Sequence, residues 1–357
     1  MSTDLDIFAG RRVLVTGDTG FMGAWLALWL AELGAEVSGL ALPPKPASLL
    51  FPEVAAAGLI HHTDCDVRDL DATRRTFAAA RPDFVFHLAA QALVRQSYAE
   101  PQVTFATNVL GSVNVLEAVR ACDSVRALVY ITSDKCYLNK EWMWGYREND
   151  ELGGHDPYSA SKACAELAFR AYADSFLAQR DGLGAATTRA GNVIGGGDRS
   201  ADRIIPDTIA ALEGGKPIVL RNPGATRPWQ HVLEPLHGYL KLAAALGRDP
   251  KAFAGAWNFG PNERAIHTVG DLACEAVAAW GGGEIVHEPV ANAPHEAGLL
   301  HLSSDKANRL LGWHTRWDFA RSVAETVGWY RAVHGGEAPL AVSRRQIAGY
   351  MRELAAS

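Results

Sequence analysis

The stretch Val13-Leu-Val-Thr-Gly-Asp-Thr-Gly-Phe-Met-Gly23 decides the fold of this 357-residue chain. A short apolar run, typical of a buried strand, ends at Thr16, and an amphipathic helix is predicted from about Phe21 to Leu33. Glycines at positions 17, 20 and 23 stand between the two. Such glycines let the backbone turn tightly and approach a pyrophosphate, which the free amides of a helix N-terminus bind. The stretch therefore predicts the first strand and helix of a dinucleotide-binding domain.

Apolar runs and helical patterns alternate over the rest of the first half, as in βαβ units. The predicted strands are Val37–Leu40, Leu59–Thr63, Phe84–Leu88, Ala127–Ile131 and Ala185–Thr188, and the predicted helices Val103–Ala121 and Pro157–Phe176. This order predicts an α/β fold, a doubly wound parallel Rossmann sheet with its ligand crevice at the carboxyl ends of the strands.

The pattern becomes irregular after Arg189, which predicts a smaller C-terminal substrate-binding lobe. We expect residues 1–190 to form the dinucleotide-binding Rossmann domain and residues 191–357 mainly the second lobe, with some of its segments returning to the sheet. A terminal helix is predicted at Val342–Ala356.

Composition excludes several classes of protein. The net charge is −6 and no segment is strongly basic, so nucleic acid and anionic membrane surfaces are not expected partners. The most apolar stretch, Ala24–Leu33, is about half the length of a membrane-spanning helix and contains Glu32. The first ten residues lack a secretory pattern. Five cysteines without a CxxC pair indicate reduced thiols in a soluble cytoplasmic protein, and no histidine has the spacing of a metal ligand.

Polar residues that could carry chemistry lie at the expected crevice. Tyr158 and Lys162 are four residues apart on one helix face, and an ammonium near a phenol lowers the pKa of the phenol. Of the nine tyrosines, only Tyr158 has a lysine at this spacing. Ser133, Asp134 and Lys135 directly follow a predicted strand. Alone, they could be a polar strand end; together with the glycines and the Tyr/Lys pair they predict a catalytic site.

These residues resemble the nucleotide-sugar 4,6-dehydratases, which are NAD-dependent enzymes of the extended short-chain dehydrogenase/reductase type. The finer resemblance is to the branch that acts on CDP-glucose. The segments that carry it are residues 17–25, 87–91, 132–137, 141–148, 153–158, 189–198 and 221–235. The glycines and the Tyr/Lys pair belong to the whole superfamily, whereas 132–137 and the last two segments are specific to the CDP-sugar branch.

The resemblance implies an intramolecular redox cycle on a nucleotide sugar. Tyr158 would take the 4-hydroxyl proton, with Ser133 sharing the hydrogen bond, as hydride passes from C4 to NAD. Asp134 would protonate the leaving C6 hydroxyl, and the hydride would return to C6, giving CDP-4-keto-6-deoxyglucose. Lys162 would hold the nicotinamide ribose. Lys135 stands where the thymidine-sugar enzymes have a glutamate as the C5 base; it could act as that base or stabilise the enolate while another group takes the proton.

The resemblance also implies the binding residues. The NAD contacts that we expect are Gly17, Thr19, Gly20, Phe21, Met22, Gly23, Asp66, Val67, Leu88, Ala89, Ala90, Thr107, Thr132, Tyr158 and Lys162. The substrate contacts that we expect are Gln91, Asn192, Val193, Arg203, Arg221, Arg227 and His231; arginine forks suit diphosphate oxygens. The second strand ends without an acidic residue for a ribose hydroxyl and without an arginine for a 2′-phosphate, so it does not by itself decide between NAD, which we favour, and NADP.

Several alternatives remain at this point. Asp18 and Met22 depart from the His and Lys of this branch, and a carboxylate beside a pyrophosphate is repulsive unless it is turned away. A 4-epimerase, or a dehydratase for another nucleotide sugar, would keep most of these residues. A non-catalytic dinucleotide sensor would not need Tyr158, Lys162, Ser133 and Asp134 together. Relatives dimerise through two helices, one being the Tyr/Lys helix, so a homodimer is expected.

Overall fold

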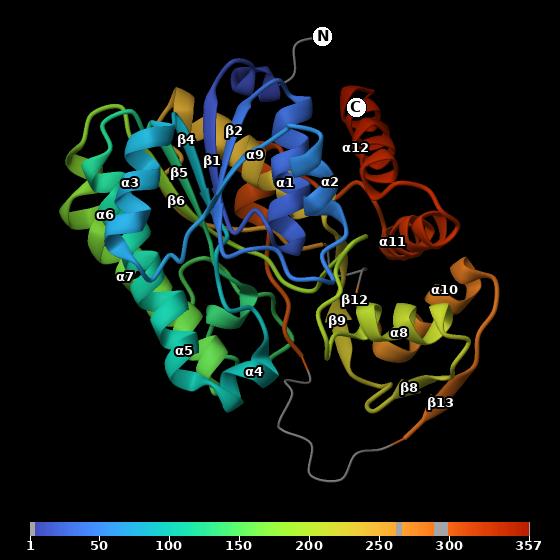
Figure 1. The fold of residues 1–357 in the computed structure, drawn as a ribbon. Helices are drawn as coiled ribbons and strands as arrows, with labels where there is room; N and C mark the ends of the chain where they lie inside the picture. The colour runs from blue at the N-terminus through green and yellow to red at the C-terminus, as the bar shows by residue number, and fades with distance from the viewer. Residues whose placement is uncertain (1–3, 262–265, 289–298, 357) are drawn as a thin grey trace.

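A parallel sheet of seven strands forms the centre of the protein (Figure 1). The structure, a computed structural model, describes residues 4–261, 266–288 and 299–356. The strand order is β11-β6-β5-β4-β1-β2-β3, and every neighbouring pair is parallel. The strands are β1 (Arg12–Thr16), β2 (Glu36–Ala41), β3 (His61–Asp64), β4 (Phe84–His87), β5 (Ala127–Ile131), β6 (Gly184–Arg189) and β11 (Gly255–Asn258). The predicted doubly wound α/β fold is thus confirmed.

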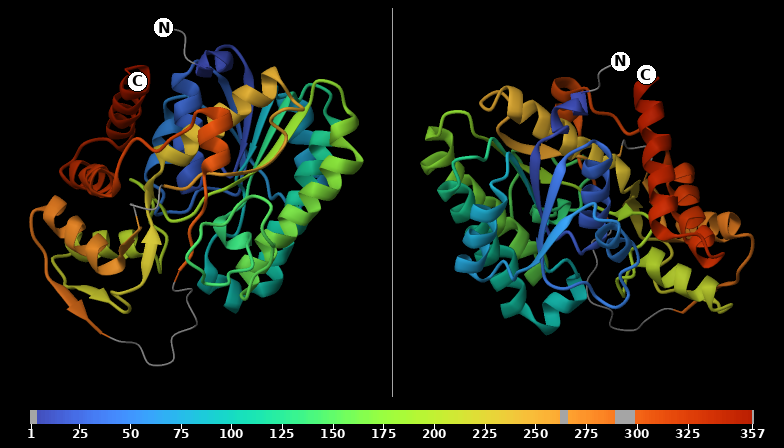
Figure 2. Two further views of the ribbon diagram at one scale, coloured as in Figure 1. Left: turned by 180° about the vertical axis from the view of Figure 1, so that it is seen from behind. Right: turned by 45° about the horizontal axis from the view of Figure 1, so that its top comes forward.

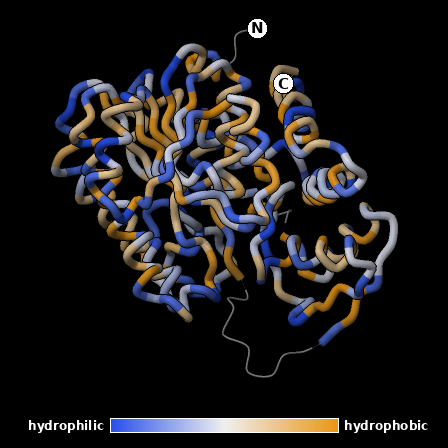
Figure 3. Tube along the Cα trace, in the orientation of Figure 1, coloured by the Kyte–Doolittle hydropathy of each residue, from blue (hydrophilic) through white to orange (hydrophobic). Residues whose placement is uncertain are grey.

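Helices cover both faces of the sheet. One face carries α1 (Phe21–Glu32) and α9 (Leu233–Arg248), and the other carries α3 (Leu70–Ala80), α6 (Ser112–Ala121) and α7 (Pro157–Ser175). Alternate residues of a strand point to opposite faces, so Val13 and Val15 join the first core and Leu14 the second. The strands form a largely hydrophobic layer between the helices (Figure 3).

The first helix differs from the prediction. Gly23–Leu30 is buried without interruption, so α1 is apolar on all sides and not amphipathic. The reason is that α1 packs against the sheet on one side and against α2 (Leu50–Ala56), α9 and the C-terminal helix on the others. A helix that is buried all round has no polar face.

The helix predicted at Val103–Ala121 consists of three segments. These are α5 (Pro101–Phe105), a π-helical segment at Ala106–Gly111, and α6; a further short helix, α4 (Val94–Ala99), precedes them. Gly111 lies where an added Cβ would be 2.8 Å from Cγ2 of Val67, so this segment passes close to the loop after β3.

The second lobe contains smaller elements beside the sheet. These are β7 (Val193–Ile194), α8 (Ile204–Glu213), β8 (Ile218–Leu220), β9 (Thr226–Pro228), β10 (Gln230–His231), β12 (Ile266–Thr268), α10 (Val269–Trp280) and β13 (Ile285–His287). They pair as β10-β7, β12-β9 and β13-β8. Short 3-10 turns lie at Asp4–Phe8, Asp134–Cys136 and Leu177–Gln179, and a second π-helical segment at Ala307–Leu311.

Two long helices end the chain, α11 (Phe319–His334) and α12 (Pro339–Ala355). Figure 2 shows them beside the N-terminal helices, and α12 packs on α1 and α2. The predicted terminal helix is confirmed. Within the described ranges, no helix combines the length and the apolarity needed to cross a membrane.

Candidate active site

The glycine loop between β1 and α1 has the shape of a dinucleotide cradle. Gly17 adopts φ +78°, and an added Cβ there would lie 2.8 Å from the backbone nitrogen of Ala89. An added Cβ at Gly23 would strike the carbonyl of Gly17, so only glycine permits this approach. Gly20 is the N-cap of α1, no side chain caps this helix, and its first turn holds no acidic residue. An uncapped helix N-terminus next to close-packed glycines fits a pyrophosphate.

Asp18, the unexpected carboxylate of this loop, is turned away from solvent. It is fully buried, and its Oδ2 lies 2.7 Å from Nδ1 of His62. An added Cβ at Gly39 would overlap this carboxylate, so the glycine in β2 makes room for it. Burial raises the pKa of Asp18, whereas His62 lowers it. The repulsion considered from the sequence is therefore reduced by the orientation of the side chain.

Most of the remaining predicted cofactor residues follow β1, β3 and β4, and Thr107 lies in the π-helical segment. The carboxyl group of Asp66 accepts hydrogen bonds from the guanidinium of Arg68, and these bonds lower the pKa of Asp66. Thr19 donates from Oγ1 to the carbonyl of Leu42, at the end of β2. Val67 is buried near Gly111, whereas Phe21, Met22, Leu88, Ala89, Ala90 and Thr107 are half-buried.

Tyr158, Ser133 and Asp134 meet at the carboxyl end of β5. Helix α7 begins with Asp156 as N-cap and Pro157 in its first turn, which sets the position of Tyr158. The Ser133 hydroxyl lies close enough to the phenol to lower the pKa of Tyr158, and its Oγ donates to Oδ1 of Asp134 at 2.9 Å. The carboxyl ends of parallel strands are where open α/β sheets place their ligands.

Burial controls the acidities at this cluster. It raises the pKa of Tyr158 to about 12, and the groups that lower this pKa are Ser133 and Arg203. Burial likewise lowers the pKa of Lys162 to about 8. The expectation that Lys162 lowers the pKa of Tyr158 is therefore wrong for the chain alone, because desolvation of the phenolate outweighs its neighbours.

Asp134 is the buried acid of the cluster. Its side chain is 3% exposed, and burial raises its pKa, which favours the protonated form. The positive charges of Lys135 and Arg227 lower the pKa of Asp134, so both cations lie close enough to influence this carboxyl group. Lys135 itself is half-buried, and its backbone N–H donates to the Ser133 hydroxyl at 3.3 Å.

A buried ion pair beneath the cluster was missed from the sequence. Glu166 of α7 accepts hydrogen bonds from Nε and Nη2 of Arg189, at 2.9 and 2.8 Å. It also accepts from the hydroxyls of Thr132 (2.5 Å) and Thr187 (2.9 Å). Arg189 continues to the Tyr137 hydroxyl at 2.7 Å. The network thus joins the ends of β5 and β6 to α7. A usable signal was present, because Glu166 stands one helical turn after Lys162.

The predicted substrate residues do not all lie together. Arg203 forms an ion pair with Asp198 at 3.1 Å and lowers the pKa of Tyr158. Arg227 lowers the pKa of Asp134. Arg221 lies 3.5 Å from Asp202.

Asn192 and Val193 follow β6, and Asn192 adopts φ +52°. The side chain of Gln91 hydrogen-bonds Leu93 of its own loop and the hydroxyl of Thr104 in α5.

The position of His231 contradicts the prediction that this residue contacts the substrate. Its ring is fully buried between Trp25 and Trp317, with centroid distances of 6.1 and 4.8 Å. Burial lowers its pKa to about 3, so the ring is neutral. A neutral histidine enclosed by two indoles packs the core and does not face a diphosphate.

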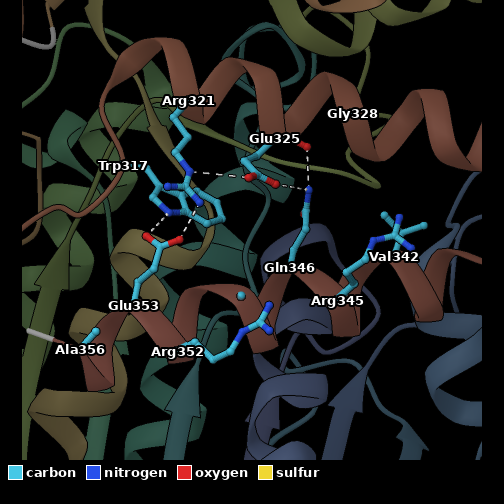
Figure 4. Close-up of a pocket in the computed structure, with 11 residues that line it drawn as sticks. Trp317, Arg321, Glu325, Gly328, Val342, Arg345, Gln346, Arg352, Glu353 and Ala356 are labelled. Atoms are coloured by element: carbon cyan, nitrogen blue, oxygen red, sulfur yellow. Dashed lines mark hydrogen bonds and ion pairs between the residues drawn. The ribbon is translucent and has the colours of Figure 1, made fainter.

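A separate groove of about 570 Å³ lies between α11 and α12 (Figure 4). Several of its charged side chains pair with each other or with neighbours, as in Arg321 with Glu353 at 2.6 Å and Arg345 with Glu337 at 2.7 Å. None of its lining residues was predicted to bind cofactor or substrate. Within the described ranges, no group of three or more His, Cys, Asp or Glu could hold a metal ion.

The fold and the cluster at β5 define a short-chain dehydrogenase/reductase of the extended, nucleotide-sugar-modifying type. The family described as GDP-mannose 4,6 dehydratase matches residues 14–326. The chain belongs to this family.

Curated relatives and solved structures agree with this assignment. A CDP-glucose 4,6-dehydratase from Salmonella typhimurium is 46% identical over 352 residues, which covers 98% of both chains. A dTDP-glucose 4,6-dehydratase from Streptomyces antibioticus is 29% identical, covering 90% of this chain and 92% of its own. The structure of a dTDP-glucose 4,6-dehydratase from Streptomyces venezuelae, solved with NAD, superimposes with a TM-score of 0.77 at 25% identity, covering 92% of this chain and 99% of its own.

Proposed function

We propose that this enzyme is an NAD-dependent CDP-glucose 4,6-dehydratase, which converts CDP-glucose into CDP-4-keto-6-deoxyglucose and water. The observation that carries the proposal is the meeting of Tyr158, Ser133 and Asp134 at the end of β5, where a phenol lies beside a hydroxyl that donates to a buried acid. The likeness to the Salmonella typhimurium enzyme along nearly the whole chain supports the choice of CDP-glucose.

The glycine loop fits NAD, and the uncapped N-terminus of α1 would bind its pyrophosphate. The cofactor, when bound, accepts a hydride and gives it back. Its positive charge would also favour the phenolate of Tyr158, whose pKa of about 12 in the chain alone is high for a base. The ammonium of Lys162 lies buried one helical turn from Tyr158, where it would hold the nicotinamide ribose.

The residues of this chain would divide the proton transfers between two groups. Tyr158, assisted by Ser133, would remove the proton of the sugar 4-hydroxyl. Asp134, whose pKa burial raises, would donate its proton to the C6 hydroxyl, which leaves as water. Lys135 would balance the enolate that forms when C5 loses its proton, or take that proton itself. Its half-buried position beside Asp134 is compatible with both roles.

Arginines from the second lobe would bind the nucleotide diphosphate. Arg203 and Arg227 each lie close enough to influence a residue of the cluster, and Arg221 belongs to the same lobe. Guanidinium forks suit phosphate oxygens. Asn192, at the turn between β6 and β7, would complete the substrate side.

A panel of CDP-, dTDP-, UDP- and GDP-sugars, with mass analysis of the products, tests this function. The expected result is the loss of one water from CDP-glucose, with bound NAD present in the purified protein. Turnover of another nucleotide sugar in preference to CDP-glucose would identify a dehydratase of the same family with a different substrate. A product of unchanged mass and inverted C4 would identify an epimerase instead.

We also propose a homodimer formed through α4, the π-helical segment and α7. These neighbouring elements expose three large apolar side chains, Tyr98 (50% exposed), Leu110 (62%) and Leu167 (54%). Exposed apolar patches mark interaction sites. Light scattering should find a dimer for the native chain and a monomer for Leu167→Glu. Leu310→Glu, at an equally exposed leucine on another segment, should remain dimeric.

All five cysteines have free thiols. This supports placing the enzyme in a reducing compartment, the cytoplasm.

A further inference from the structure

Gly191, two residues after β6, lies against the carboxyl group of Asp134. The three heavy atoms nearest to an added Cβ at this position are Cγ, Oδ1 and Oδ2 of Asp134. All three would be closer than the 3.0 Å limit that real Cβ atoms respect. The carboxyl group therefore occupies the volume that any other side chain at position 191 would need.

Space, and not backbone conformation, explains the glycine. Gly191 does not adopt the left-handed conformation that favours glycine, although the next residue, Asn192, does with φ +52°. An alanine at position 191 would thus be compatible with the backbone. It would be incompatible only with the present position of the Asp134 side chain.

The backbone around Asp134 has little freedom to move away. Its N–H donates to the carbonyl of Ala190 at 3.2 Å, and Thr132 N–H donates to the carbonyl of Thr188 at 2.8 Å. The two strand ends are therefore tied together up to the contact. A methyl group at position 191 would have to be accommodated by rotation of the Asp134 side chain.

Such a rotation would break the contacts that orient the acid. Oδ1 accepts from the Ser133 hydroxyl at 2.9 Å, and Oδ2 lies 3.5 Å from Nδ2 of Asn192. The first contact joins Asp134 to the hydroxyl that lies beside the Tyr158 phenol. Gly191 and Asn192 thus form one side of the space that holds the carboxyl group.

We infer that Gly191 is a positioning residue for the elimination step, because it alone leaves the space in which the Asp134 carboxyl group faces C6 of the sugar. This inference rests on the proposed dehydratase function. In that step the O–H bond of the carboxyl group breaks as its proton goes to the C6 hydroxyl. The C6–O bond then breaks and water leaves, while a base, Lys135 or another group, takes the C5 proton and the electrons of the C5–H bond form the C5–C6 double bond. Oxidation at C4 uses Tyr158 and Ser133, which keep their positions.

The test compares Gly191→Ala with the native enzyme on CDP-glucose and on CDP-6-deoxy-6-fluoroglucose. Turnover of CDP-glucose should fall about 100-fold, the cost of misplacing a catalytic group by about 1 Å. Fluoride leaves without being protonated, so turnover of the fluoro substrate should fall far less. Reduced nicotinamide should accumulate in the variant and be visible by its absorbance, because C4 oxidation continues while elimination is slow. Asp134→Asn should behave in the same way.

Gly184, the first residue of β6, provides the matched control. An added Cβ at Gly184 would meet Leu246 at 2.9 Å, far along the strand from the site. Gly184→Ala should lower the melting temperature but leave the ratio of the two substrates at the native value. A native ratio in Gly191→Ala as well would overturn the inference. If the native enzyme itself removes no water from CDP-glucose, the proposed function fails instead.

A stability measurement keeps the inference testable if Gly191→Ala folds poorly. Removing the Asp134 carboxyl group frees the volume that the methyl group at position 191 needs. The double variant Asp134→Ala/Gly191→Ala should therefore have a higher melting temperature than Gly191→Ala alone. Additive losses in the double variant would show that the two side chains do not compete for one volume, and the inference would be wrong.

Discussion

Replacing Glu166 by glutamine removes the negative charge from a pair that the fold buries completely. Glu166 and Arg189 are 3% and 4% exposed at their side chains, and their closest atoms are 2.8 Å apart. A guanidinium stays protonated in proteins, so Arg189 stays charged in the variant although it loses the carboxylate that raises its pKa. The variant therefore leaves a buried cation beside a neutral amide.

The magnitude follows from the number of contacts that survive. Breaking a buried pair costs about 3–5 kcal/mol, because the remaining charge is uncompensated. Glutamine keeps one acceptor oxygen for Thr132, Thr187 or Arg189, so we expect the lower end, about 3 kcal/mol. With roughly 2 °C per kcal/mol for a chain of this size, the melting temperature should fall by about 6 °C.

The assay is thermal unfolding followed by circular dichroism, with Asp174→Asn as the control. Asp174 forms an ion pair with Arg170 of the same helix at 3.9 Å. Both side chains are largely exposed, Arg170 at 79% and Asp174 at 75%. An exposed pair is worth less than about 1 kcal/mol, so this control should melt within about 2 °C of the native chain. Equal melting temperatures for Glu166→Gln and the native chain would refute the reasoning.

Three further predictions concern the cofactor, the base and the pH dependence of stability. Tyr158→Phe should lower turnover by about 10³-fold, within the usual range for a general base, while the NAD content of the purified protein stays native. Gly17→Ala should lose bound NAD, measured by extraction and absorbance, because its Cβ would strike the β4 loop; Gly34→Ala, with a similar φ of +80° and 3.8 Å of space, should retain it. Burial raises the pKa of Glu234 from 4.5 to about 7, so the folded state holds a proton that the unfolded state has lost between these values. Stability should therefore decline by about 3 kcal/mol as pH rises through that window, and urea unfolding of Glu234→Gln should show a smaller decline; identical pH profiles would contradict this.

Local patterns allowed much of the fold to be predicted. The run Ala127–Ile131 coincides with β5, and the glycine loop follows β1 as expected. The polar sequence of β3, His61–Asp64, shifted its predicted position, because an edge strand that is partly exposed carries little apolar signal. β11 was not predicted, since Gly255-Ala-Trp-Asn258 lacks the run of branched residues that marks a buried strand.

The site was predictable where chemistry and position coincide in the sequence. Tyr158 and Ser133 were found because they follow recognisable elements. Contacts between distant segments were not predictable, since sequence spacing does not show that Glu166 meets Arg189 or that Gly191 meets Asp134. The division into residues 1–190 and 191–357 stays a prediction, and β11 and α9 of the second part pack on the sheet of the first.

Transfer of a deuterium label tests the proposed reaction most directly. CDP-glucose that carries deuterium at C4 is incubated with the enzyme, and the product is examined by mass spectrometry and NMR. The proposed cycle predicts a 4-keto sugar that has lost one water and carries the label at C6. A sugar that keeps its C6 hydroxyl and its label at C4, whether inverted or unchanged, would contradict it.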